Sequence, residues 1–167
     1  MWLTKYDTDA TLYKLISSLN QIRTHAYEND NYGTYAGFTI YHDDHTMAMR
    51  KGFNGSQVIT VLTNEGEGAY SHTLNLKNTG FSPGEKVMEV LVCKEQTVQS
   101  DGTINVIMKD GQPNVFYPSK ALNGSKICQP GSPPPKSGSR SSRKVFGDSS
   151  ILAFVGVLSL WITLLCW

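Results

Sequence analysis

Turn signals recur about every ten residues through the middle of the chain, and this spacing constrains the fold most strongly. They begin at Asp43-Asp44 and Asn54-Gly55 and continue to Asp101-Gly102 and Asp110-Gly111. Asn, Asp and Gly readily adopt the backbone conformations of tight turns. The segments between the turns are short and alternate between apolar and polar residues, which is typical of half-buried strands. The sequence therefore predicts a mainly β fold, an antiparallel sandwich of short strands.

We place the expected strands near residues 37–42, 46–51, 56–63, 70–76, 86–93, 95–100, 103–109 and 114–117. In the fourth strand, side chains on one face should all point inward because the side-chain period of a strand is two residues. That face contains Tyr70, His72, Leu74 and Leu76.

The N-terminal part of the chain has a helical period instead. From Thr8 to about Asn29, apolar residues recur every three or four positions, which predicts one amphipathic helix. Its apolar stripe consists of Leu12, Leu15, Ile16, Leu19, Ile22 and Ala26. A sandwich closes its own core when its two sheets pack together. We therefore expect the stripe to pack against elements outside the sandwich.

The last part of the chain changes composition twice. Residues 129–150, QPGSPPPKSGSRSSRKVFGDSS, contain a run of three prolines and few apolar residues, which predicts an extended stalk. Residues 151–167 carry no charge and predict a C-terminal apolar helix. At 1.5 Å per residue this helix would span about 25 Å, which is less than the hydrocarbon core of a bilayer.

Basic residues precede this tail rather than follow it, which disfavours a permanent membrane span. Small residues, a polar spacer and an apolar tail together form a signal for a glycosylphosphatidylinositol (GPI) anchor. The sequence offers Ser137 and Gly138 as candidate attachment residues. A cytosolic protein anchored by its tail is the alternative interpretation.

Two further patterns are typical of secreted proteins. Asn54-Gly-Ser56 and Asn123-Gly-Ser125 are acceptor sequences for N-glycosylation and fall in expected turns. Cys93 and Cys128 either form a disulfide, which would close a loop of about 35 residues, or remain free thiols. The third cysteine, Cys166, lies in the apolar tail.

Catalytic patterns are weak in this sequence. The carboxylates Asp43, Asp44, Glu65 and Glu67 fall in expected turns, where solvated side chains are typical. The sequence contains no nucleophile elbow, phosphate-binding loop or dinucleotide fingerprint. Taken alone, the chain does not have the pattern of an enzyme.

Neither a metal nor a nucleic acid is an expected ligand. His42-Asp-Asp-His45 is a turn that would hold a metal only weakly, so we assign no metal site. The net charge is +1, with acidic and basic residues spread along the chain. Phosphate backbones require a concentrated basic face, so we expect no nucleic-acid partner.

Four segments together resemble the C-terminal part of fungal α-amylases of glycoside hydrolase family 13. They are LYKLISSLNQIR, IYHDDHTMAMRKGFNGSQVITVLTNEG, FSPGEKVMEVLVCKEQTVQSDG and VFYPSKALNGSKIC. The resemblance runs from about Trp2 to Cys128, and the stalk and tail resemble those of GPI-anchored members. It implies that residues 1–36 hold the last helix of a (β/α)₈ catalytic barrel, that residues 37–128 form the Greek-key sandwich called domain C, and that Cys93 pairs with Cys128.

The resemblance also implies a function for the parent enzyme. Such enzymes hydrolyse internal α-1,4-glucosidic bonds of α-glucan with retention, using an Asp, a Glu and a second Asp. These residues and the calcium ligands belong to motifs that would precede Met1, so the chain alone should be inactive and contain no cofactor site. We expect it to be extracellular and anchored by lipid at the cell surface or wall.

The alternative is a non-catalytic glucan-binding or structural module at the cell surface. Tyr35 and Phe38, with Tyr41 close by, are candidate sugar contacts because exposed aromatic rings stack on sugar faces. The same rings would otherwise pack in a seam between two domains.

Overall fold

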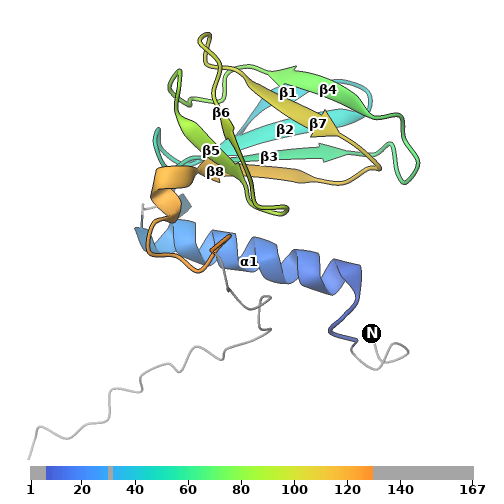
Figure 1. Cartoon of the computed structure of the whole chain (residues 1–167), viewed down its shortest axis with the longest axis horizontal. Coiled ribbons are helices and arrows are strands. Elements are labelled where there is room, and N and C mark those ends of the chain that lie inside the picture. Colours follow the sequence, from blue (N-terminus) through green and yellow to red (C-terminus); the bar gives the residue numbers. More distant parts are fainter. Residues whose placement is uncertain (1–6, 30–31, 130–167) are drawn as a thin grey trace, which may run out of the picture. The chain divides into compact units, whose positions relative to one another are not determined.

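The computed structural model describes residues 7–29 and 32–129 (Figure 1). The candidate attachment residues Ser137 and Gly138, nearly all of the expected stalk and the whole apolar tail lie outside the described residues. Among the helices of the described ranges, none is long and apolar enough to cross a membrane.

The described residues form one long helix and eight strands. The helix is α1 (Thr11–Asn29), and a short 3-10 helix η2 (Tyr32–Thr34) follows it. The strands are β1 (Phe38–His42), β2 (Thr46–Lys51), β3 (Val58–Thr63), β4 (His72–Leu76), β5 (Lys86–Glu89), β6 (Lys94–Thr97), β7 (Ile104–Met108) and β8 (Asn114–Pro118), and a second 3-10 helix η3 (Ser119–Leu122) ends the fold. The prediction of a mainly antiparallel β fold with one leading helix is confirmed.

The strands form two sheets of unequal size. The larger sheet has the order β1-β2-β3-β8-β5-β6, and the smaller one pairs β4 with β7. Every strand pair is antiparallel. Strand β8 is inserted between β3 and β5, so the last of the described strands joins the two halves of the larger sheet.

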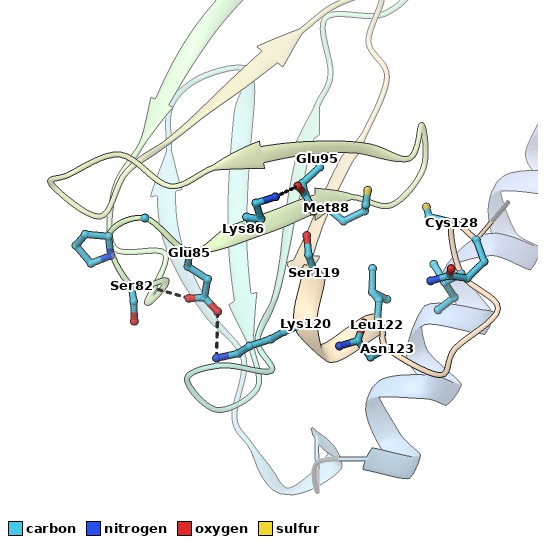
Figure 2. Close-up of a pocket in the computed structure, with 14 residues that line it drawn as sticks. Ser82, Glu85, Lys86, Met88, Glu95, Ser119, Lys120, Leu122, Asn123 and Cys128 are labelled. Carbon is cyan, nitrogen blue, oxygen red and sulfur yellow. Dashed lines mark hydrogen bonds and ion pairs between the residues drawn. The ribbon is translucent and has the colours of Figure 1, made fainter.

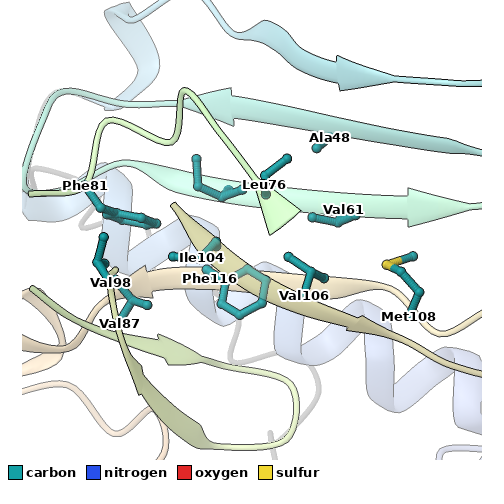
Figure 3. Close-up of a cluster of buried hydrophobic side chains, with 11 residues drawn as sticks. Ala48, Val61, Leu76, Phe81, Val87, Val98, Ile104, Val106, Met108 and Phe116 are labelled. Carbon is teal, nitrogen blue, oxygen red and sulfur yellow. The ribbon is translucent and has the colours of Figure 1, made fainter. Parts of the chain in front are cut away.

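An apolar core fills the space between the two sheets (Figure 3). Leu76, Ile104 and Val106 from the smaller sheet contribute to it and are fully buried. The larger sheet supplies Ala48, Ile59, Val61, Val87 and Phe116 to the same cluster. Side chains in β2 and β7 alternate between buried and exposed, as expected for strands with one face on a core.

A second core lies on the outer face of the larger sheet, where α1 packs. Ile22 and Ala26 of α1 are buried in one cluster with Val58, Val115 and Tyr117 of β3 and β8. Because β3 and β8 are covered on both faces, their sequences are nearly continuous apolar runs rather than alternating ones.

This packing corrects our expectation that the stripe of α1 has no partner in the sandwich. The C-terminal half of the stripe is covered by the larger sheet, and His25 Nε2 lies 2.7 Å from the carbonyl oxygen of Ala121. The N-terminal half remains uncovered in the described residues, with Leu12, Ile16 and Leu19 exposed by 65%, 49% and 36%.

The expected inward face of the fourth strand is also wrong in part. Leu76 is fully buried and Leu74 is half-buried, but His72 is exposed and Tyr70 is 89% exposed. Strand β4 begins only at His72, so Tyr70 precedes the pairing with β7. Of the predicted inward face, only Leu74 and Leu76 join the core between the sheets.

Candidate functional site

Among the candidate carboxylates, Asp43 stabilises the turn in which it lies. Asp43 Oδ1 accepts hydrogen bonds from the backbone N–H groups of His45 (2.8 Å) and Thr46 (2.6 Å). Its Oδ2 accepts one from the Tyr41 hydroxyl at 2.6 Å. These hydrogen bonds lower the pKa of Asp43 below its ordinary value, and the bond from Tyr41 has the largest effect. This carboxylate is therefore a permanent acceptor in the turn between β1 and β2, which is unlike a general acid.

The turn that contains His42 and His45 holds no metal-binding cluster among the described residues. His45 Nδ1 lies 3.1 Å from Asn64 Oδ1 at the neighbouring turn. In residues 7–29 and 32–129, no three side chains of His, Cys, Asp or Glu gather closely enough to hold a metal ion.

Three aromatic rings do come together, at the junction of η2 and β1. The ring centroids of Tyr35 and Phe53 are 4.9 Å apart with planes at 76°, and those of Tyr35 and Phe38 are 6.3 Å apart. Phe38 is 43% exposed and Phe53 is 48% exposed. We call Tyr35, Phe38 and Phe53 the aromatic cluster.

A buried arginine supports this cluster from the sheet. Arg50 of β2 is only 9% exposed, and its guanidinium carbon lies 5.6 Å from the Phe38 centroid. The guanidinium also donates a hydrogen bond to the side-chain oxygen of Asn54. A Cβ atom at Gly80 would collide with this guanidinium, so the loop before β5 helps hold it in place. Cation–π attraction then stabilises the position of Phe38.

The structure thus brings together the two predicted sugar contacts, Tyr35 and Phe38. It adds Phe53, which the sequence reasoning did not include. An available signal was the position of Phe53 in the turn Gly52-Phe-Asn-Gly55, because an aromatic residue in a turn is often exposed. The predicted neighbour Tyr41 is not part of the cluster's ring contacts; its hydroxyl is bonded to Asp43.

The remaining predicted sites lie apart from this cluster, with one exception. Cys93 and Cys128 form a disulfide with their Cα atoms 5.2 Å apart. Asn123 is exposed in the turn after η3. Asn54 is exposed next to Phe53 and is therefore adjacent to the aromatic cluster.

Comparison with known proteins gives consistent matches along most of the chain. Residues 39–133 match the family described as "Alpha-amylase, domain C". Over 129 residues, 77% of the chain, it is 39% identical to Alpha-amylase 1 of Schwanniomyces occidentalis and 50% identical to Alpha-amylase 1 of Lipomyces kononenkoae. The segments matched are 25% and 21% of those two proteins, so the chain spans about a quarter of the curated relatives it matches.

A solved structure has the same fold. The α-amylase from Malbranchea cinnamomea aligns with a TM-score of 0.70 and 43% sequence identity. The alignment covers 77% of this chain and 27% of that one.

Proposed function

This chain belongs to the α-amylase domain C family, a family of non-catalytic domains, and from that premise we propose that it serves as the β-sandwich of an extracellular α-amylase. Hydrolysis of internal α-1,4-glucosidic bonds is then performed by a catalytic domain that packs against the sandwich. α-Glucan is the substrate of the whole protein, and the residues described here contribute to folding and attachment rather than to bond cleavage.

The uncovered half of α1 supports this assignment most directly. Leu12, Ile16 and Leu19 form an apolar face, whereas Ile22 and Ala26 on the same helix are fully packed against the sandwich. A helix with apolar residues on both a covered and an uncovered stretch is suited to lie between two domains. The catalytic barrel of an α-amylase is the partner we propose for the uncovered stretch.

A domain exchange tests this proposal. In Alpha-amylase 1 of Lipomyces kononenkoae, the part of the matched segment that aligns with residues 7–129 is replaced with those residues. Because 50% of the aligned residues are identical, we expect the chimera to be secreted and to hydrolyse soluble starch. Residues 7–129 alone should show no hydrolysis. An inactive chimera beside an active parent, or hydrolysis by residues 7–129 alone, would contradict the proposal.

The aromatic cluster supports a second, compatible role in binding glucan. Two of its three rings have more than a third of their surface exposed, and Tyr35 holds Phe53 in an edge-to-face contact. Rigid exposed rings bind pyranose faces through apolar area with little loss of conformational freedom. We propose that Tyr35 and Phe38, together with Phe53, contact α-glucan.

We also propose a GPI anchor at Ser137 or Gly138 that places the protein at the plasma membrane and cell wall. The order of small residues, polar spacer and apolar tail supports this. Release of the surface-displayed protein by a phosphatidylinositol-specific phospholipase would test it, and retention on treated cells would contradict it.

A further inference from the structure

A groove of about 720 Å³ lies beside η3, apart from the aromatic cluster (Figure 2). Its wall includes the loop before β5, strands β5 and β6, η3 and the turn that follows η3. We call it the η3 groove. Its volume is in the range of sites that hold small ligands.

Charged and polar groups converge on the η3 groove. Lys86 Nζ and Glu95 Oε1 form an ion pair of 2.9 Å, and Lys120 Nζ lies 3.6 Å from Glu85 Oε1 (Figure 2). The side chain of Glu85 is only 10% exposed. Its Oε2 accepts a hydrogen bond from the backbone N–H of Ser82 at 2.9 Å.

One acceptor in this wall lacks a hydrogen-bond donor. Glu85 Oε1 is buried, and no donor of the described residues reaches it at hydrogen-bond distance, although the Lys120 ammonium group is near. Since this oxygen has almost no accessible surface, a ligand in the groove meets instead the carboxylate of Glu95, whose side chain is 39% exposed. Carboxylate oxygens accept hydrogen bonds from hydroxyl and amide groups, and saccharides carry many such donors.

Asn123 lies on the wall of the same groove, and it is the acceptor of the sequence Asn123-Gly-Ser125. Its side chain is exposed, and no atom lies within 4 Å of the position where Gly124 would carry a Cβ. A glycan on Asn123 would therefore start at the groove with open space around its attachment point.

The lining favours a tethered sugar over a free one. Among the described residues that line the η3 groove there is no aromatic side chain, so the stacking that free saccharides rely on is missing. A tether raises the effective concentration of a weak ligand to the order of millimolar. Polar contacts alone are then sufficient to hold it.

We propose that the η3 groove holds the first N-acetylglucosamine residues of an N-glycan attached to Asn123. In the attachment, the Asn123 amide nitrogen loses a proton and bonds to C1 of the sugar, while the lipid pyrophosphate of the oligosaccharide donor leaves. The sugar hydroxyl and acetamido groups donate to Glu95 and accept from Lys86 and Lys120. The seated sugar also covers Cys128, which lines the same groove. This inference rests on the extracellular role proposed above.

Lysine footprinting of the full chain, directed into a yeast secretory pathway by an added leader, tests the proposal. Peptide mass spectrometry first measures sugar on Asn123 and Asn54. A dilute amine-acetylating reagent then reports the reactivity of Lys86, Lys120 and Lys109. All three are ion-paired, and their side chains are exposed by 67%, 69% and 68%. Lys109 does not line the groove and is the internal control.

The comparison variant is Asn123→Gln, which removes the sugar without removing a hydrogen bond that the Asn123 side chain makes to the described residues. We expect Lys86 and Lys120 to react at least about threefold more slowly in the glycosylated protein than in the variant, as for a tethered ligand bound most of the time. Lys109 should react equally in both. Asn54→Gln should leave the footprint of the wild type unchanged.

Two results would overturn the proposal about the η3 groove without affecting the extracellular role. One is equal reactivity of Lys86 and Lys120 in wild type and Asn123→Gln although Asn123 carries sugar. The other is sugar on Asn54 with none on Asn123. Absence of sugar from both asparagines would overturn it as well, and would leave the extracellular role to be judged by the domain exchange.

Discussion

The Glu89 carboxylate accepts a hydrogen bond of 3.0 Å from the backbone N–H of Val115, on the neighbouring strand. The same carboxylate accepts bonds from the N–H groups of Val92 (2.7 Å) and Leu91 (3.3 Å). Glu89 is 6% exposed, so a single buried side chain joins β8 to the turn that carries Cys93.

Glu89→Ala should therefore lower the free energy of unfolding by about 2 to 4 kcal/mol, because buried backbone donors lose a charged acceptor. Glu89→Gln keeps one carbonyl oxygen and should cost about half as much. Urea unfolding followed by circular dichroism measures both values. A loss below about 0.5 kcal/mol for the alanine variant, within the range of an ordinary surface substitution, would contradict this role.

Reduction of the Cys93–Cys128 disulfide should destabilise the sandwich. The bond joins residues separated by 35 positions, and loop-closure entropy for that length corresponds to about 3 to 4 kcal/mol. Urea midpoints measured with and without a thiol reductant give the difference. Cys128→Ser provides the control, since its stability should be low and unaffected by reductant. Equal stability of the oxidised and reduced wild type would disprove the expectation.

The pKa of Asp43 should respond to a change at Tyr41. Hydrogen bonds hold the pKa of Asp43 below its ordinary value of 3.8, and the largest contribution comes from the Tyr41 hydroxyl. Because the folded-state pKa is lowered, the stabilisation is complete above the ordinary value and is lost as the pH falls through the folded value. Tyr41→Phe removes the largest cause and should raise the pKa of Asp43.

Carboxyl-carbon NMR titration measures this change. Asp101, whose pKa is lowered by Thr103 instead, is the internal control and should titrate identically in both proteins. An unchanged midpoint for Asp43 in Tyr41→Phe would show that the hydroxyl has no influence on the carboxylate.

If the aromatic cluster binds glucan, removing one of its rings should lower the affinity for starch, whereas removing an exposed ring elsewhere should not. Phe38→Ala or Phe53→Ala should weaken binding to insoluble starch by about three- to tenfold, as expected for one stacked ring. Tyr70→Ala is a matched control, because Tyr70 is 89% exposed and lies outside the cluster. Depletion of the protein from solution by starch granules gives the affinity. Similar affinities for all three variants and the wild type would exclude this surface.

The strands were predictable because turn residues and alternation are local properties of the sequence. Runs such as β3, with Val58 and Ile59 both buried, indicated a strand by length and composition although neither face is polar. The division into sheets of six and two strands was not predictable, because pairing of β8 with both β3 and β5 is a long-range choice.

The candidate sites were predictable only where their residues lie close together in the sequence. Tyr35 and Phe38 are close in sequence, but Phe53 joins them across the pairing of β1 with β2. The ion pair between Glu85 and Lys120 depends on where η3 lies against β5. No periodicity in the sequence encodes that contact.

The apolar face of α1 offers the most direct test of the assignment to an α-amylase. In the Lipomyces chimera, Leu12→Asp with Ile16→Asp is compared with Gln21→Asp with Thr24→Asp, which adds the same charge at exposed polar positions of the helix. The quantity measured is the rate of starch hydrolysis per culture volume. Burial of two unpaired carboxylates against a barrel costs several kcal/mol, so we predict at least a tenfold loss for the first pair and little change for the second. Equal activity of the two chimeras would contradict the proposal that this helix packs against the catalytic domain.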